Sequence, residues 1–134
     1  HVLPALIRKF HEAKLNNEDV ILWGSGKPLR EFLHVDDLAD ATMFFVQNES
    51  ESHLYNIGSG EELSISDLAI LIQKIVNHKG NILYDNNYPD GTPRKLLDTK
   101  RINDLGWRPK INLSEGIKNT YHDLLKKESL LRKE

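Results

Sequence analysis

Residues 29–47 read Leu-Arg-Glu-Phe-Leu-His-Val-Asp-Asp-Leu-Ala-Asp-Ala-Thr-Met-Phe-Phe-Val-Gln, and the change from strand to helix within this stretch decides the fold class. Residues 29–34 predict an extended segment. Asp36 and Asp37 follow, and carboxylates are favoured in the first turn of a helix because the macrodipole is positive there. We therefore predict a helix over 36–47. A strand that leads into a helix is typical of α/β proteins.

The same alternation continues on both sides of this stretch. Apolar spacing and capping residues predict further helices over 3–13, from Ser64 to Gly80, over 99–105 and from Asn112 onward. Short apolar runs predict strands over 20–23, 55–57 and 82–84. Residues 85–95 form a loop long enough to favour a functional role. The predicted fold is α/β, a small mixed sheet with surrounding helices.

Composition excludes several classes of protein. The chain has 134 residues, 39 % of them hydrophobic, which suits one compact core. Its net charge of −2 disfavours a nucleic-acid or anionic-membrane binder, and no apolar run approaches the roughly 18 residues of a membrane span. The absence of cysteine fits a reducing compartment, and we expect a cytoplasmic protein. Because the chain opens with His1 rather than Met, directly before the predicted helix over 3–13, we also expect it to be part of a longer protein.

Two glycine turns imitate a dinucleotide-binding loop. Gly58-Ser59-Gly60-Glu61-Glu62-Leu63 lies between a predicted strand and a helix, but Leu63 replaces the third glycine and the two carboxylates would repel a pyrophosphate. Gly24-Ser25-Gly26 lacks the third glycine as well. The segment from His34 to Asp37 offers metal-ligand types, although a strand end followed by a helix start explains it better.

Basic residues in two predicted loops suit a diphosphate. Arg30 follows a Gly/Pro loop, and Arg94 and Lys95 lie at the end of the 85–95 loop. Arginine binds phosphates bidentately and lysine adds a point charge, while the alternative is that these side chains are merely solvated. Trp23 either stacks on a base or sugar ring or, as the end of a buried strand, belongs to the core.

Three stretches resemble the C-terminal, substrate-binding part of the extended short-chain dehydrogenase/reductases that act on nucleotide sugars. They are residues 30–39 (REFLHVDDLA), 55–60 (YNIGSG) and 105–109 (LGWRP). Two narrower stretches, residues 1–13 (HVLPALIRKFHEA) and 89–98 (PDGTPRKLLD), are similar to the GDP-L-fucose synthase branch of that family. The resemblance covers residues 1–125, implied to be a nucleotide-sugar-binding domain, and leaves 126–134 as a charged tail.

This resemblance implies an NADPH-dependent enzyme that epimerises GDP-4-keto-6-deoxy-D-mannose at C3 and C5 and reduces C4 to give GDP-L-fucose. His1 matches the histidine that shares the acid/base role with a cysteine in the family. The resemblance also implies that His1 contacts NADP(H). The cysteine, a Ser/Tyr/Lys set and the glycine-rich loop lie upstream in family members. We therefore expect that the Rossmann domain is absent from this chain and that the chain alone is inactive. In the full-length enzyme, we expect the Rossmann domain to bind most of NADP(H) and to form the contact of a homodimer.

The substrate residues follow from the same resemblance. Arg30 matches the arginine that contacts the nucleotide diphosphate, and Trp23 matches a tryptophan of the substrate pocket. Lys95 matches a lysine near the phosphates, with Asp90 and Arg94 in the same loop. Lys9 stands where relatives often have a second basic residue. No metal is implied.

Two other functions remain open from the sequence. The chain also fits the corresponding part of another nucleotide-sugar epimerase or dehydratase that uses UDP or dTDP. A non-catalytic ligand-binding or interaction domain is the alternative from a different class. Nucleotide preference distinguishes the UDP- or dTDP-sugar enzyme from the leading hypothesis. The sequence upstream of His1 distinguishes the non-catalytic domain from it.

Overall fold

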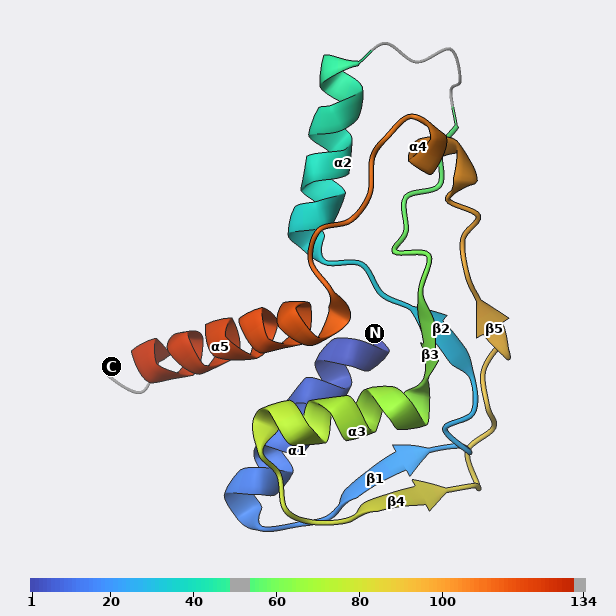
Figure 1. Cartoon of the computed structure of the whole chain (residues 1–134). Helices are drawn as coiled ribbons and strands as arrows, with labels where there is room; N and C mark the ends of the chain where they lie inside the picture. The colour runs from blue at the N-terminus through green and yellow to red at the C-terminus, as the bar shows by residue number, and fades with distance from the viewer. Residues whose placement is uncertain (49–53, 132–134) are drawn as a thin grey trace.

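A computed structural model describes residues 1–48 and 54–131, and the side chains of residues 1–48 and 54–127. Five helices and five strands alternate along this part of the chain (Figure 1): α1 Val2–Asn16, β1 Val20–Trp23, β2 Leu29–Glu31, α2 Val35–Gln47, β3 Glu62–Ser64, α3 Ile65–Val76, β4 Ile82–Asp85, β5 Arg94–Lys95, α4 Lys100–Asp104 and α5 Leu113–Leu131. The predicted α/β class is confirmed. None of the helices in these ranges is long and apolar enough to cross a membrane.

The strands form two small sheets. β1 and β4 pair in parallel, with Trp23 opposite Asp85. In the other sheet β2 is central, antiparallel to β3 and parallel to β5. Arg30 lies in register with Leu63 on one side and with Lys95 on the other. The polypeptide therefore crosses from one sheet to the other between Trp23 and Leu29, and again between Asp85 and Arg94.

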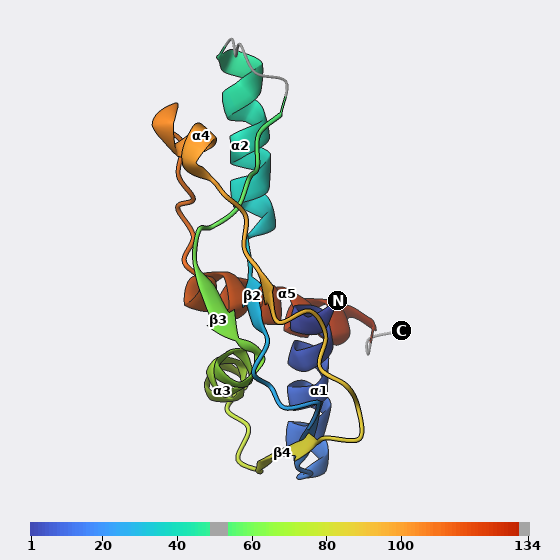
Figure 2. The same ribbon diagram turned by 90° about the vertical axis from the view of Figure 1, so that its right-hand side faces the viewer.

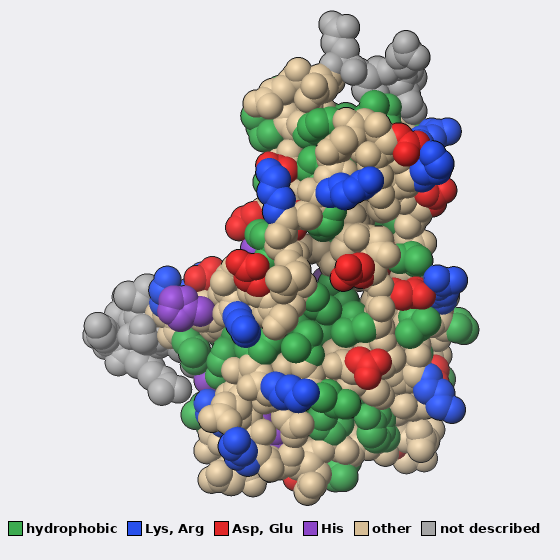
Figure 3. Space-filling view, viewed as in Figure 1, with side chains coloured by type: hydrophobic (Ala, Val, Ile, Leu, Met, Phe, Trp, Pro, Cys, Tyr) green, Lys and Arg blue, Asp and Glu red, His purple; other side chains and the backbone are tan. Residues whose placement is uncertain are grey.

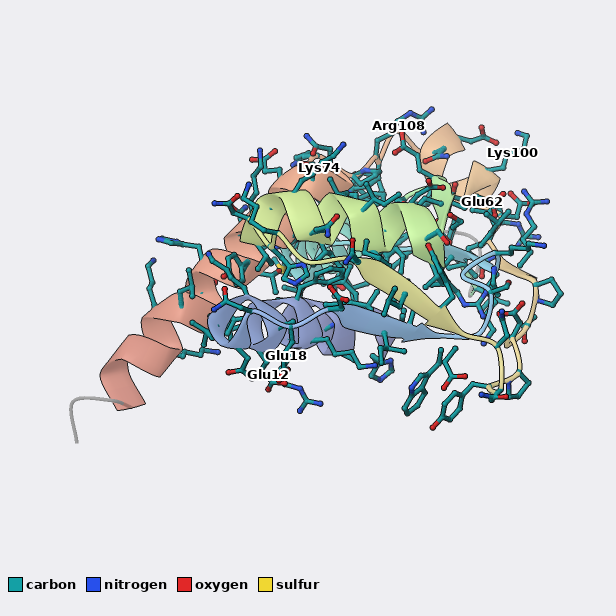
Figure 4. The ribbon with its side chains drawn as sticks, turned by 90° about the horizontal axis from the view of Figure 1, so that it is seen from below. Glu12, Glu18, Glu62, Lys74, Lys100 and Arg108 are labelled. Carbon is teal, nitrogen blue, oxygen red and sulfur yellow. The ribbon has the colours of Figure 1, made fainter. Side chains whose placement is uncertain are left out.

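The main core lies between α1, α3 and α5 and one side of β1. Figure 4 shows α3 above α1, with β4 running beside them. The residues buried here are mostly aliphatic: Leu6, Ile7, Phe10, Ala13, Val20, Leu22, Leu68, Ala69, Ile72, Val76, Ile117 and Tyr121. A smaller cluster of Ala41, Ile102 and Trp107 packs α2 against α4. Figures 1 and 2 show that α2 and α4 stand at one end of an elongated molecule.

Most of the predicted helices are confirmed because their capping side chains act locally. The Ser64 hydroxyl accepts a hydrogen bond from the backbone N–H of Asp67 (3.0 Å), and Asn112 caps α5 through the N–H of Glu115 (2.9 Å). Asn77, in the left-handed conformation, ends α3 before Gly80 is reached. α5 continues to Leu131, while 132–134, the end of the predicted tail, lie outside the described residues.

The predicted strands are less accurate. Residues 55–57, predicted to be a strand, pair with no strand in the described ranges. The side chain of Asn56 instead donates to the carbonyl of Asp98 (3.1 Å). β3 and β5 were not predicted, and both are short strands that exist only because β2 lies between them.

Candidate functional site

A cleft opens where the polypeptide crosses between the two sheets. Its volume is about 160 Å³, and it is lined by Val2, Trp23, Gly26, Pro28, Arg30, Ile65, Pro89, Asp90 and Gly91. Three predicted substrate residues meet here, namely Trp23, Arg30 and Asp90. Sites for small ligands usually measure about 300–1,000 Å³, so this cleft holds only part of a nucleotide-sized ligand.

A larger cavity of about 300 Å³ lies between β3 and the segment 109–113 that leads into α5, where Figure 3 shows hydrophobic side chains gathered. Its charged lining residues are Glu61, Glu62 and Lys110. None of the predicted site residues lines it. The cleft between the sheets is therefore the candidate site.

The Gly24–Gly26 turn binds the carboxylate of Asp90. Asp90 accepts hydrogen bonds from the backbone N–H of Ser25 (2.8 Å, Oδ1) and from the Ser25 hydroxyl (2.6 Å, Oδ2). These two hydrogen bonds, of which the one from the hydroxyl has the larger effect, hold the pKa of Asp90 below its usual value. The group is therefore an anion at neutral pH. Gly24 has φ +78°, and a Cβ there would lie 2.4 Å from Asp90 Oδ1. Only glycine allows this approach.

Arg30 is anchored through one nitrogen. Its Nη1 donates to the carbonyls of Leu29 and Thr92, both at 2.7 Å. No other hydrogen bond to this side chain occurs within the described ranges, so Nε and Nη2 remain available to an anion. Nη2 would lie 3.2 Å from a Cβ at Gly91, which shows how closely the loop approaches the guanidinium.

The two basic residues of β5 lie on opposite faces of the sheet. Lys95 is in register with Arg30 and shares its face, because partners in a ladder point the same way. Its side chain is exposed and has no hydrogen bond or ion pair with any described residue. Arg94 lies on the other face, where its Nε donates to the Glu62 carboxylate (2.9 and 3.0 Å), and that hydrogen bond raises the pKa of Arg94. Figure 4 shows Glu62 at the end of the molecule toward which β4 points.

Trp23 is 63 % exposed, so its interpretation as a core residue is wrong. Its ring stacks on Tyr88, with 4.4 Å between centroids and 11° between planes. The Lys9 ammonium lies 5.0 Å from the centre of the Trp23 ring and donates to the carbonyl of Ile21 (3.0 Å). Lys9 therefore serves Trp23 and β1, with a cation–π contact that suits the ring's negative face.

His1 directly precedes Val2, a residue of the candidate site. It is exposed, precedes α1 and makes no capping hydrogen bond with its side chain. Its neighbour Val2 lines the cleft. His1 is therefore adjacent to the cleft in sequence, and its contact with a ligand stays a prediction.

The other glycine turn already holds an anion of the chain itself. Glu31 accepts from the backbone N–H of Gly60 (2.7 Å) and of Leu97 (3.0 Å), and a Cβ at Gly58 would lie 2.4 Å from its Oε1. The rejection of this turn as a dinucleotide site thus has a geometric reason.

The metal alternative near His34 finds no support either. Asp37 is buried and accepts from the backbone N–H groups of Lys110 and Ile111, both at 3.0 Å. His34 accepts from the N–H of Asp36 (3.2 Å) and so caps α2. No group of three metal-ligating side chains occurs in the parts of the chain that the structure describes.

Sequence reasoning missed Ser25, Tyr88 and Thr92, which hold the site residues in place. Ser25 was noted only as part of a failed dinucleotide turn. Tyr88 carries no motif, and Thr92 acts through its backbone carbonyl. The one available signal was the length of the loop that carries Tyr88 and Thr92.

Comparison with known proteins shows what the chain is similar to. The model of the NAD dependent epimerase/dehydratase family matches residues 1–58. Putative GDP-L-fucose synthase 2 of Arabidopsis thaliana is 56 % identical over 122 residues, which are 90 % of this chain and 37 % of that protein. GDP-L-fucose synthase of Escherichia coli is 45 % identical over an alignment of 143 positions, which covers 98 % of this chain and 44 % of that protein. The first 58 residues thus match the NAD dependent epimerase/dehydratase family, and nearly the whole chain is similar to part of the GDP-L-fucose synthases.

The resemblance to the GDP-L-fucose synthases is confirmed. The chain spans about two fifths of the length of the relatives it matches. A solved GDP-L-fucose synthetase from Naegleria fowleri bound to NADP superposes with a TM-score of 0.89 at 29 % identity, covering 96 % of this chain and 41 % of that one. The fold is therefore that of the corresponding part of an extended short-chain dehydrogenase/reductase.

Proposed function

We propose that residues 1–125 are the nucleotide-sugar-binding part of an NADP-dependent GDP-L-fucose synthase. The observation that carries the proposal is the meeting of Trp23, Arg30 and Asp90 at one cleft, in a chain 45–56 % identical to GDP-L-fucose synthases. The whole enzyme would epimerise GDP-4-keto-6-deoxy-D-mannose at C3 and C5 and reduce C4.

Arg30 and Lys95 are the proposed diphosphate residues. They lie side by side on one face of the sheet, and both have donors without partners among the described residues. A guanidinium beside an ammonium matches the charge and the paired oxygens of a diphosphate. Arg94 supports them from the opposite face, because its ion pair with Glu62 fastens the two-residue strand β5.

Trp23, Lys9 and Asp90 complete the proposed substrate contacts. Trp23 is stacked on Tyr88 and lies under the Lys9 ammonium, and the part of its ring that stays exposed offers an apolar wall to a base or sugar. The ionised Asp90 only accepts hydrogen bonds, so it suits N–H or O–H groups of the ligand and disfavours phosphates at its own position. Arg30 and Lys95 would thus take the phosphates, and Asp90 the donor groups of the ligand.

His1 is the proposed acid/base residue. The C4 ketone makes the C–H bonds at C3 and C5 acidic, so a base can remove a proton there to leave an enolate, and an acid can return a proton to the opposite face. The exposed imidazole of His1, which precedes the cleft residue Val2 in the chain, suits one of these transfers. The second group of the pair would come from outside this chain.

NADP(H) supplies the hydride for reduction at C4. Both glycine turns of this chain hold its own carboxylates, Asp90 at Gly24 and Glu31 at Gly58, so neither fits the cofactor's phosphates. We therefore propose that NADP(H) is bound mainly by residues outside this chain, with His1 reaching it.

Isothermal titration of the chain with GDP, UDP and dTDP tests the proposal. We expect GDP to bind more tightly than either pyrimidine nucleotide. A preference for UDP or dTDP would instead support another nucleotide-sugar enzyme, and a chain that binds none of the three would support a non-catalytic domain. The chain mixed with NADPH and the keto sugar should show no turnover; NADPH oxidation would contradict the expected division of the active site.

A further inference from the structure

One loop of the proposed substrate site contacts Trp23, Ser25 and Arg30. Residues 86–93, here called the 86–93 loop, connect β4 to β5. Within it Tyr88 stacks on Trp23, Asp90 binds the Ser25 turn, and the carbonyl of Thr92 holds the Arg30 guanidinium. The cleft exists only while this loop lies against the polypeptide that crosses from β1 to β2.

Tyr88 acts in this arrangement through its ring alone. The side chain is 43 % exposed, and its hydroxyl makes no hydrogen bond within the described part of the chain. A nearly parallel ring 4.4 Å away covers one face of Trp23 and limits the rotation of the indole. Because Pro89 and Asp90 follow directly and line the cleft, the stack also sets where they lie.

We propose that Tyr88 is a positioning residue of the nucleotide-sugar site. By stacking on Trp23 it keeps the 86–93 loop against the Gly24–Gly26 turn, so that Trp23 and Arg30 are in place before the ligand arrives. The inference rests on the proposed function. Ordering these groups in advance removes an entropic cost that binding would otherwise carry, and so raises affinity without a new ligand contact.

The first test measures the stack without ligand. The chain has two tryptophans, and Trp107 is only 4 % exposed against 63 % for Trp23, so acrylamide quenches mainly Trp23 fluorescence. We expect Tyr88→Ala to raise the quenching constant, because one face of Trp23 is uncovered. Tyr88→Phe keeps the ring and should behave as wild type. Leu83→Ala, which shortens a half-exposed side chain of β4, is the matched truncation control.

The second test measures GDP binding by the same variants. Tyr88→Ala should raise the Kd for GDP about 3- to 10-fold, the scale of one aromatic pair, while Tyr88→Phe and Leu83→Ala stay within about twofold. Ser25→Ala loosens the same loop by removing the 2.6 Å bond to Asp90, and should also raise the Kd. Far-ultraviolet circular dichroism confirms that each variant folds.

The outcomes separate this inference from the proposed function. Unchanged quenching in Tyr88→Ala, or higher quenching with an unchanged Kd, would overturn the role of Tyr88 while the proposed function stands. A weakened Tyr88→Phe would assign the effect to the hydroxyl and overturn positioning by the ring. A wild-type chain that does not bind GDP would overturn the proposed function, and this role with it.

Discussion

Arg30 combines a fixed guanidinium with open donors. Nη1 is held by two backbone carbonyls, which leaves Nε and Nη2 for a diphosphate. We expect Arg30→Ala to weaken GDP binding by about 1.5–3 kcal/mol, the scale of a lost hydrogen bond to a charged group. Isothermal titration measures the change. Arg8→Ala, which removes an exposed arginine paired with Glu12 on α1, should leave the affinity unchanged, and an equal loss in both variants would indicate general electrostatics.

Asp90 makes the turn around Ser25 sensitive to acid. Its pKa is lowered by the hydrogen bonds from Ser25, so the stabilisation that they provide is complete above the ordinary pKa of 3.8 and is lost as the pH falls through the lower value in the folded protein. Carbon-13 NMR titration of the Asp90 carboxyl should therefore give a midpoint below 3.8. Ser25→Ala should move that midpoint upward, toward the ordinary value. A midpoint that stays the same in Ser25→Ala would contradict the contact between Ser25 and Asp90.

At the scale of elements, the two-residue strand β5 depends on side chains outside it. A strand this short at a sheet edge has little pairing of its own. Glu62 holds Arg94 on one face, and Glu31 holds the backbone N–H of Leu97 just beyond the strand. The position of Lys95 beside Arg30 is thus set by two carboxylates from β2 and β3.

Glu31→Gln tests this dependence. The amide has one acceptor where the carboxylate has two, so either Gly60 or Leu97 loses its partner. We expect a loss of about 1–2 kcal/mol in the free energy of unfolding, measured by urea denaturation. Glu61→Gln changes a neighbouring glutamate whose side chain makes no hydrogen bond among the described residues, and should cost almost nothing. Equal losses would show that only net charge matters.

At the scale of the whole molecule, stability comes mainly from the core between α1, α3 and α5. Ile72 of α3 is fully buried in it, whereas Ile70 on the same helix is 42 % exposed. We expect Ile72→Ala to lower the free energy of unfolding by about 2–5 kcal/mol, because a cavity is added to the lost transfer energy. Ile70→Ala should cost much less. Urea denaturation compares the two, and similar losses would contradict the assigned core.

Helices were predicted better than strands for a physical reason that particular segments show. A helix satisfies its backbone hydrogen bonds locally, so the caps at Ser64 and Asn112 and the apolar stripe of α3 were readable along the chain. A strand needs a partner that is distant in sequence. Residues 55–57 have the composition of a strand but no described partner, and Arg94 and Lys95 became a strand because β2 lies beside them.

The sequence by itself determined the α/β class, the helices and the resemblance to the GDP-L-fucose synthases, since periodicity, capping and continuous motifs all lie within short stretches. It also determined that Arg30, Asp90, Arg94 and Lys95 are candidate ligand residues. Only the tertiary structure decided which of them meet: Arg30 and Asp90 share a cleft with Trp23, while Arg94 lies on the opposite face with Glu62. The reason is that strand register and loop contacts join residues more than 60 positions apart, and these long-range contacts determine which face each side chain occupies.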